Sequence, residues 1–344
     1  MKKILLIFGL LLILITSSLW AEYLYIRSFT ADTAPGPIAV SQNPTTTDCY
    51  YATFNNVNCT VYYVPDFLTS AGTSDQRLIA GPITFDPVQI RGFQGIAIDT
   101  NDNVFVSGDN GGGTPVGIFR KYTPNPGKTV WTQDVTFNPD NTVRYTGCAL
   151  LNDDRIVVSI SVPVGLGVKV LSTANGSSIA DLPADTYYGR EPTFNPANND
   201  IYQGFNDLGV GTNTFEIYIS GDPNNIGNYV LDATTLFADS VGNVARKHNG
   251  YDNINYQLLH IDTQNKILEI YDVNTTLRGA ASINTTPVQT IDLTLIAAGT
   301  SPFDVAHMRV NDDDYLLITD YGSAVNQIHV FGPPPTKANT WMVY

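Results

Sequence analysis

Short strand-like segments alternate with tight polar turns along nearly the whole chain, and this repetition constrains the fold more than any other feature. The stretch "GFQGIAIDTNDNVFVSGDNGGG", residues 92–113, contains two alternating apolar strands around an Asp- and Asn-rich turn, and "GIFRKYT" and "TVWTQDVTF" add two more. Comparable segments recur around Gly36, Gly147, Glu191, Gly250 and Phe303, with 44 to 59 residues between successive anchors. Four-strand repeats of this length are typical of β-propeller blades.

The two ends of the repeat array predict how the ring closes. The last repeat, "SPFDVAHMRVNDDDYLLITDYG" followed by "QIHVFG", has three strands, and the alternating segment "EYLYIRSF", Glu22–Phe29, precedes the first complete repeat. We therefore predict an all-β fold, a six-bladed β-propeller with four antiparallel strands per blade over residues 22–332. In this fold the N-terminal strand completes the last blade and removes an exposed sheet edge.

The template repeat resembles an NHL repeat, in which a glycine and small apolar residues enter the innermost strand before an Asp/Asn-rich turn and a Gly/Asp-rich loop. The resemblance covers nearly all of residues 22–332 as architecture and about one blade as sequence. NHL propellers are mostly recognition platforms, with some enzymatic relatives. The resemblance therefore implies a fold more firmly than an activity.

Residues 1–21 have the pattern of a signal peptide, with Lys2 and Lys3 before an apolar run from Ile4 to Ile15. This run is shorter than a membrane-spanning helix requires, and no later stretch approaches that length. We expect a secreted protein, extracellular or at the cell surface, with no transmembrane segment.

The charge balance limits the partners. The chain has 18 Lys and Arg against 32 Asp and Glu, a formal net charge of −14, so it repels nucleic acid on average. Five basic residues nevertheless precede the innermost strands and are expected to ring one mouth of the channel: Arg91, Arg144, Arg190, Arg246 and Lys247. They predict a protein, glycan or other anionic ligand, unless each pairs with an acidic neighbour.

A catalytic alternative uses acidic residues and histidines expected near the channel. Glu191, His248, Asp304 and His307, with Asn249, are candidates for a metal-dependent, lactonase- or esterase-like hydrolase. The first blade's "PGPIAV" lacks the Glu that the resemblance to propeller lactonases implies, and no G-x-S-x-G motif occurs. We therefore favour a non-catalytic binding or structural platform and keep the hydrolase as the alternative.

The turn residues Asp99, Asn101 and Asp102 offer oxygen ligands for calcium, the one cofactor considered. Asp and Asn also stabilise tight turns by themselves, and this is the favoured interpretation. No cofactor is otherwise expected.

Candidate modifications fall in predicted turns or loops. Four N-glycosylation sequons occur, at Asn58, Asn175, Asn274 and Asn284. The three cysteines leave at least one unpaired within the chain. A Cys49–Cys59 bridge is one possibility, although the two positions are not opposite each other across the predicted turn, and Cys148 is expected to be buried.

Residues 333–344 form a Pro-rich tail ending in Trp341, Met342, Val343 and Tyr344. These side chains either fold back on their own blade or dock on a neighbouring copy. The second possibility predicts a homo-oligomer or a filament.

Overall fold

The computed structural model describes residues 23–333, with gaps at 55–57, 86–91, 111–115, 163–166, 183–187, 207–211, 223–224, 234–238, 241–246, 253–255, 264 and 323–325. The strands form six antiparallel sheets, each built on a path of four strands, which are the six predicted blades. Three short 3-10 helices lie between strands: η1 (Thr73–Asp75), η2 (Gly279–Ser282) and η3 (Leu293–Leu295). Within the described ranges, no helix is long and apolar enough to cross a membrane.

The first three blades follow one another along the chain, each beginning with its innermost strand. Blade 1 contains β2 (Pro35–Val40), β3 (Cys49–Thr53), β4 (Asn58–Val64) and β5 (Arg77–Thr84). Blade 2 contains β6 (Gly92–Ile98), β7 (Val104–Asp109), β8 (Gly117–Pro124) and β9 (Trp131–Gln133). Blade 3 contains β10 (Arg144–Asn152), β11 (Arg155–Val162), β12 (Val168–Ser172) and β13 (Ser178–Asp181).

The remaining blades repeat this arrangement, except that the last takes its outermost strand from the start of the chain. Blade 4 contains β14 (Tyr188–Asn195), β15 (Asp200–Asn206), β16 (Thr212–Asp222) and β17 (Asn225–Ala233), with β18 (Asp239–Ser240) paired to β16. Blade 5 contains β19 (Lys247–Asp252), β20 (Gln257–Asp262), β21 (Ile267–Asp272) and β22 (Gln289–Asp292). Blade 6 contains β23 (Pro302–Val310), β24 (Asp313–Asp320), β25 (Gln327–Gly332) and β1 (Leu24–Thr30).

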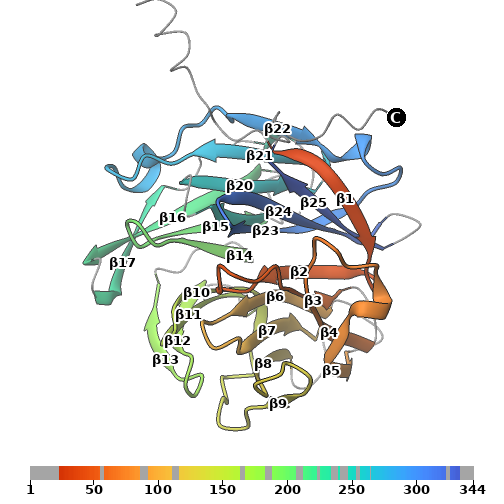
Figure 1. Ribbon diagram of the computed structural model, residues 1–344. Coiled ribbons are helices and arrows are strands. Elements are labelled where there is room, and N and C mark those ends of the chain that lie inside the picture. The colour runs from red at the N-terminus through yellow and green to blue at the C-terminus, as the bar shows by residue number, and fades with distance from the viewer. Residues whose placement is uncertain are drawn as a thin grey trace, which may run out of the picture.

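The predicted ring closure is confirmed. Strand β1 pairs antiparallel with β25, from Leu24 opposite Gly332 to Thr30 opposite Gln327. Figure 1 shows β1, in red, beside the blue strands of the chain's other end.

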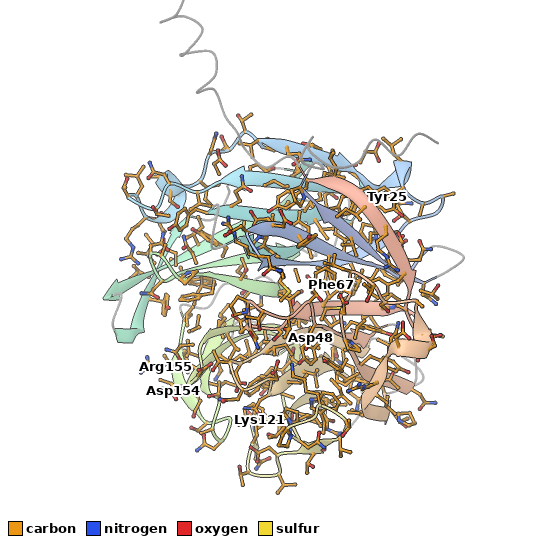
Figure 2. All side chains as sticks on the ribbon, viewed as in Figure 1. Tyr25, Asp48, Phe67, Lys121, Asp154 and Arg155 are labelled. Carbon is orange, nitrogen blue, oxygen red and sulfur yellow. The ribbon has the colours of Figure 1, made fainter. Side chains whose placement is uncertain are left out.

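The hydrophobic core consists of six layers, one between each pair of neighbouring blades. This follows from the strand pattern, because a blade that is apolar on both faces must be covered on both sides. The layer between blades 6 and 1 joins Phe29 of β1 with Phe67 and Cys49 of blade 1, and Phe67 lies at this junction in Figure 2. The N-terminal strand therefore contributes to the packing that closes the ring.

A chain of polar contacts also holds β1 in place. Buried Asp320 is 3.1 Å from His329 Nε2, and His329 Nδ1 is 2.6 Å from the Ser28 hydroxyl on β1. Burial alone raises the pKa of Asp320, but hydrogen bonds from His329, Thr300 and two backbone N–H groups outweigh it and lower the pKa to about 2. The ionised carboxylate thus orients a buried histidine toward the closing strand.

Candidate functional site

The innermost strands bring polar side chains to the propeller axis through β-bulges. Among the described strand pairs, five of the six innermost strands shift register with their neighbour near the anchor position of the repeat. A bulge leaves a residue out of the ladder and re-aims its side chain. The residues skipped in the pairing include four buried polar ones: Gln94, Thr146, Glu191 and Asp304.

Glu191 and Asp304 meet across the axis. The innermost strands contact one another in the ring order β2, β6, β10, β14, β19, β23 and β2 again, so the strands bearing Glu191 and Asp304 are not neighbours. The two carboxyl groups nevertheless form a hydrogen bond with each other. Asp304 also accepts backbone N–H groups, from Ile38 at 2.8 Å and from Val305 at 2.7 Å.

These contacts assign a role to each carboxyl. Burial, then the charge and hydrogen bond of Asp304, raise the pKa of Glu191 well above its usual value. Burial raises the pKa of Asp304 to about 7, although the N–H groups of Ile38 and Val305 and the Glu191 hydrogen bond oppose the shift. The two groups therefore share a proton near neutral pH, with Glu191 as donor and Asp304 as acceptor.

A cavity of about 180 Å³ reaches this carboxyl pair. We call it the throat; residues of β2, β6, β10, β14 and β23 line it, including Glu191, Asp304 and His307. A wider cavity of about 550 Å³, the funnel, shares Val40, Gln42 and His307 with the throat. Together they form a path from the surface toward the axis.

The funnel opens on the face that carries the turns between first and second strands. Its lining includes Ser41, Gln42 and Pro44 after β2, and Thr100, Asp153 and Pro196 in the corresponding turns of three other blades. The backbone N–H of Thr100 is 3.1 Å from an Asp153 carboxylate oxygen, which links the turns of blades 2 and 3. Sequence reasoning placed the ligand at the opposite end of the innermost strands and missed this mouth.

Three of the four alternative catalytic residues line the throat: Glu191, Asp304 and His307. His307 lies within β23, with Nε2 3.2 Å from Asp314 Oδ1. The side chains of His248 and Asn249 lie outside the described residues; their backbones pair with Ile261 and His260 of β20.

The structure describes the side chain of one of the five predicted basic ligand-binding residues. Arg144, the first residue of β10, has its Nε 3.5 Å from buried Asp109 Oδ1, so it has the acidic neighbour that the alternative interpretation requires. Arg91 and Arg246, and the side chains of Arg190 and Lys247, lie outside the described residues. A basic ring at this mouth stays a prediction.

Two carboxylates predicted as calcium ligands, Asp99 and Asp102, already contact other groups of the protein. Asp99 accepts backbone N–H groups from Asn101 and Asn103, both at 2.9 Å, as in a tight Asx-stabilised turn. Asp102 forms an ion pair with Lys128 at 2.9 Å. In the part of the chain that the structure describes, no three His, Cys, Asp or Glu side chains group together as metal ligands.

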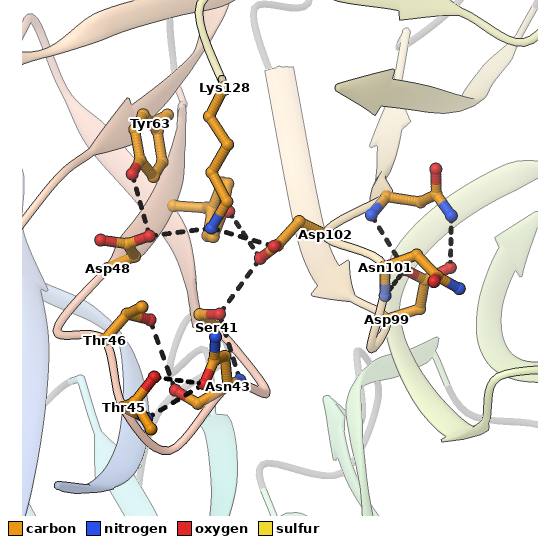
Figure 3. A network of polar contacts seen from close by, with 12 residues as sticks. Ser41, Asn43, Thr45, Thr46, Asp48, Tyr63, Asp99, Asn101, Asp102 and Lys128 are labelled. Atoms are coloured by element: carbon orange, nitrogen blue, oxygen red, sulfur yellow. Dashed lines mark hydrogen bonds and ion pairs between the residues drawn. The ribbon is translucent and has the colours of Figure 1, made fainter. Parts of the chain in front are cut away.

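Lys128 is the centre of a network that sequence reasoning missed (Figure 3). Its Nζ lies 2.8 Å from Asp48 and 2.9 Å from Asp102, and Tyr50 and Tyr63 donate hydrogen bonds to the same carboxylates. Burial lowers the pKa of Lys128, but the two carboxylates outweigh it and raise the pKa overall. Because Lys128 and Asp102 belong to blade 2 and Asp48 to blade 1, the network joins adjacent blades.

The structure shows the exposure of the candidate glycosylation sites and of the cysteines. All four sequon asparagines are exposed: Asn58, Asn175, Asn274 and Asn284. The last three lie in turns or loops as predicted, whereas Asn58 is the first residue of strand β4. All three cysteines are buried, and none of them forms a disulfide bond. Cys49 packs between blades 6 and 1 and Cys59 between blades 1 and 2, so they lie on opposite faces of one sheet and a bridge between them is excluded.

The predicted assembly residues Trp341, Met342, Val343 and Tyr344 lie outside the described residues.

Comparison with known proteins supports the fold alone. No protein-family model matches the chain, and no curated protein sequence matches it. A similar solved structure is the Cps50 (Swd1) β-propeller domain of Myceliophteria thermophila, with a TM-score of 0.50 and 9% sequence identity over 90% of this chain and 99% of that one. The chain is thus a six-bladed β-propeller, and the NHL resemblance stays a prediction.

Proposed function

We propose that this chain is an extracellular, non-catalytic binding platform whose copies assemble through the C-terminal segment. The observation that carries the binding role is the funnel of about 550 Å³ continuing into a throat of about 180 Å³. Five blades contribute walls to this path, so a ligand there contacts most of the ring. Concave sites of this size with mixed linings are typical of ligand binding.

The lining favours a ligand that has both apolar faces and hydrogen-bonding groups. Leu150, Phe194 and Met308 supply apolar surface, and Gln42 and Arg309 supply donors near the entrance. A glycan or an extended peptide has this combination of groups. The basic residues predicted at the other end of the channel remain the proposed contacts for an anionic ligand.

A blocking substitution tests the funnel. Gln42 is exposed and lines both cavities, so Gln42→Trp fills the entrance without disturbing a buried residue. We expect glycan and peptide arrays probed with the protein to lose their signals with Gln42→Trp. The matched control is Gln133→Trp, an exposed position on outermost strand β9 that lines neither cavity. Signals retained by the blocked variant, or absent from the arrays altogether, would contradict the proposal.

The extracellular location is supported by the leader pattern of residues 1–21. Expression of the full chain in a secreting host, followed by N-terminal sequencing of protein from the medium, tests it. We expect the new terminus near Glu22. Retention of the complete leader inside the cell would contradict the location.

A metal-dependent hydrolase is the second candidate, favoured by the presence of Glu191, Asp304 and His307 in one throat. Paired carboxyl groups that share a proton are suited to general acid–base chemistry. Ester or lactone turnover that is lost with Glu191→Gln and is sensitive to chelators would favour this function. Binding without turnover favours the platform.

A further inference from the structure

The outermost strand of blade 6 presents an unusual edge. Within the described residues, β1 pairs with β25 alone, which leaves its other edge without a strand partner. Its first three residues, Leu24, Tyr25 and Ile26, are consecutive large apolar residues with 40%, 48% and 46% of their surface exposed. Exposed apolar sheet edges are templates for pairing with another strand.

The other outermost strands carry features that discourage such pairing. Strand β5 contains Pro82, which cannot donate to a ladder, and β9, β13 and β22 are only three or four residues long. Strand β17 carries the charged Asp232, whose carboxylate accepts the backbone N–H of Ala280. Strand β1 has seven residues without a proline, and its one irregularity is a bulge at Ile26 in the ladder with β25.

The exposed apolar residues of β1 are limited to its beginning. Further along, Arg27 donates to the Leu68 and Ser70 carbonyls of blade 1, and Gln76 donates to the Thr30 carbonyl at 2.8 Å. At the beginning, Tyr25 packs edge-on against Phe331, and Ile26 lies beside Gly332 (Figure 2 labels Tyr25). These two side chains therefore offer apolar surface for an incoming strand.

We propose that the edge of β1 from Leu24 to Ile26 receives residues 336–344 of a second copy as an added strand. This inference rests on the proposed assembly through the C-terminal segment and names its acceptor. Trp341, Met342, Val343 and Tyr344 would alternate between the two faces of the added strand. Their apolar side chains match the exposed surfaces of Tyr25 and Ile26, and main-chain hydrogen bonds supply the rest of the contact.

The position of the tail favours a second copy over the same chain. The tail leaves blade 6 at Gly332, on β25, directly opposite Leu24. To reach the free edge of its own β1 it must turn back around the start of that strand, next to Tyr23. The backbone N–H and carbonyl of Tyr23 are held by the Gln289 side chain of blade 5, at 3.1 and 2.9 Å. The β1 edge of a second copy can be reached without this reversal of the chain.

The length of the C-terminal tail also allows it to contact a second copy. The eleven residues 334–344 extend to roughly 35 Å at about 3.3 Å per residue. The three prolines at 333–335 are expected to stiffen the first part of this segment. A donor strand on one copy and an acceptor edge on another make a head-to-tail contact, which continues as a filament unless the rotation closes a ring.

Sedimentation of four proteins over a range of concentrations tests the acceptor. They are the wild type, a deletion of residues 334–344, Ile26→Lys, and Val135→Lys as a control at an exposed apolar residue on blade 2, 82% exposed against 46% for Ile26. We expect concentration-dependent association of the wild type and Val135→Lys, and a loss of about tenfold or more in affinity for the deletion and Ile26→Lys. Association lost on deletion but unchanged by Ile26→Lys overturns the acceptor and leaves tail-dependent assembly standing. A monomeric wild type overturns both.

Disulfide trapping separates the second copy from the same chain. Leu24→Cys protein is mixed with Val343→Cys protein under mild oxidation, and the native cysteines are buried. We expect a covalent heterodimer that a peptide of residues 333–344 inhibits. Failure to form the heterodimer, with an internal disulfide in a chain carrying both substitutions, places the tail on its own blade and overturns the proposal. Binding of the protein lacking residues 334–344 to the glycan and peptide arrays tests the proposed role of the funnel independently of assembly.

Discussion

Glu191→Gln should make the protein more stable than the wild type, and increasingly so as the pH rises. In the wild type, burial and the neighbouring Asp304 keep the pKa of Glu191 well above its usual 4.5. The folded state therefore holds a proton that the unfolded chain releases once the pH exceeds 4.5. A glutamine at this position can still donate a hydrogen bond to the Asp304 carboxylate, but it does not titrate and therefore takes up no proton on folding.

The size of the effect follows from proton linkage. An acid whose folded pKa is raised contributes stability that is fully present below its unfolded pKa and is lost as the pH rises. While Glu191 stays protonated above pH 4.5, this loss is about 1.4 kcal/mol per pH unit. Asp304, with its pKa raised to about 7, adds a loss in the same direction below that pH. The Glu191→Gln variant lacks the loss of stability that comes from Glu191.

Urea unfolding followed by tryptophan fluorescence at several pH values between 4 and 8.5 measures the difference. We expect the two proteins to differ least at the acid end and most at the alkaline end. A difference that does not change with pH, or a wild type that gains relative stability as the pH rises, would show that the two carboxyl groups do not share a proton in the throat.

The remaining predictions concern packing and charge. Lys128→Met leaves two carboxylates facing each other between blades and should lower the free energy of unfolding by about 2–4 kcal/mol, whereas Lys169→Met, at a surface pair, should cost under ~1 kcal/mol in the same urea titration. Gly95→Ala places a Cβ 2.5 Å from a backbone nitrogen of the next blade and should prevent soluble expression, while Gly127→Ala, with its nearest neighbour at 3.9 Å, should express normally. His329→Leu breaks the polar link to the closing strand and should cost about 2–4 kcal/mol in denaturant unfolding; an unchanged midpoint would contradict that role.

The blade arrangement was predictable because each strand carries its own pattern. Alternating apolar residues, Gly and Asp-rich turns and a near-constant spacing are local features, and they recur often enough to number the blades. The pairing of β1 with β25 followed from one surplus strand and one missing strand, and the structure confirms it. The repeat family does not follow from the same pattern, since strand periodicity is shared by many unrelated propellers.

The candidate site was only partly predictable. Glu191, Asp304 and His307 were candidates from residue type, and the structure places them in one throat. Its opening on the face of the first hairpin turns was not foreseen. Polar residues beside the anchor glycines, such as Gln94 and Thr146, were the available signal, because bulges at those positions turn side chains out of the ladder.

The sequence by itself determined the number of blades, their strand order and the closure by the first strand, because these depend on patterns within each segment. Only the tertiary structure decided which side chains meet. The Glu191 and Asp304 carboxyls come together across the axis from strands that are not neighbours, and Lys128 reaches Asp48 from the next blade. Such contacts depend on how the blades are rotated about the ring and on where β-bulges shift the register of the innermost strands. Neither feature is encoded in the spacing of residues along a single strand.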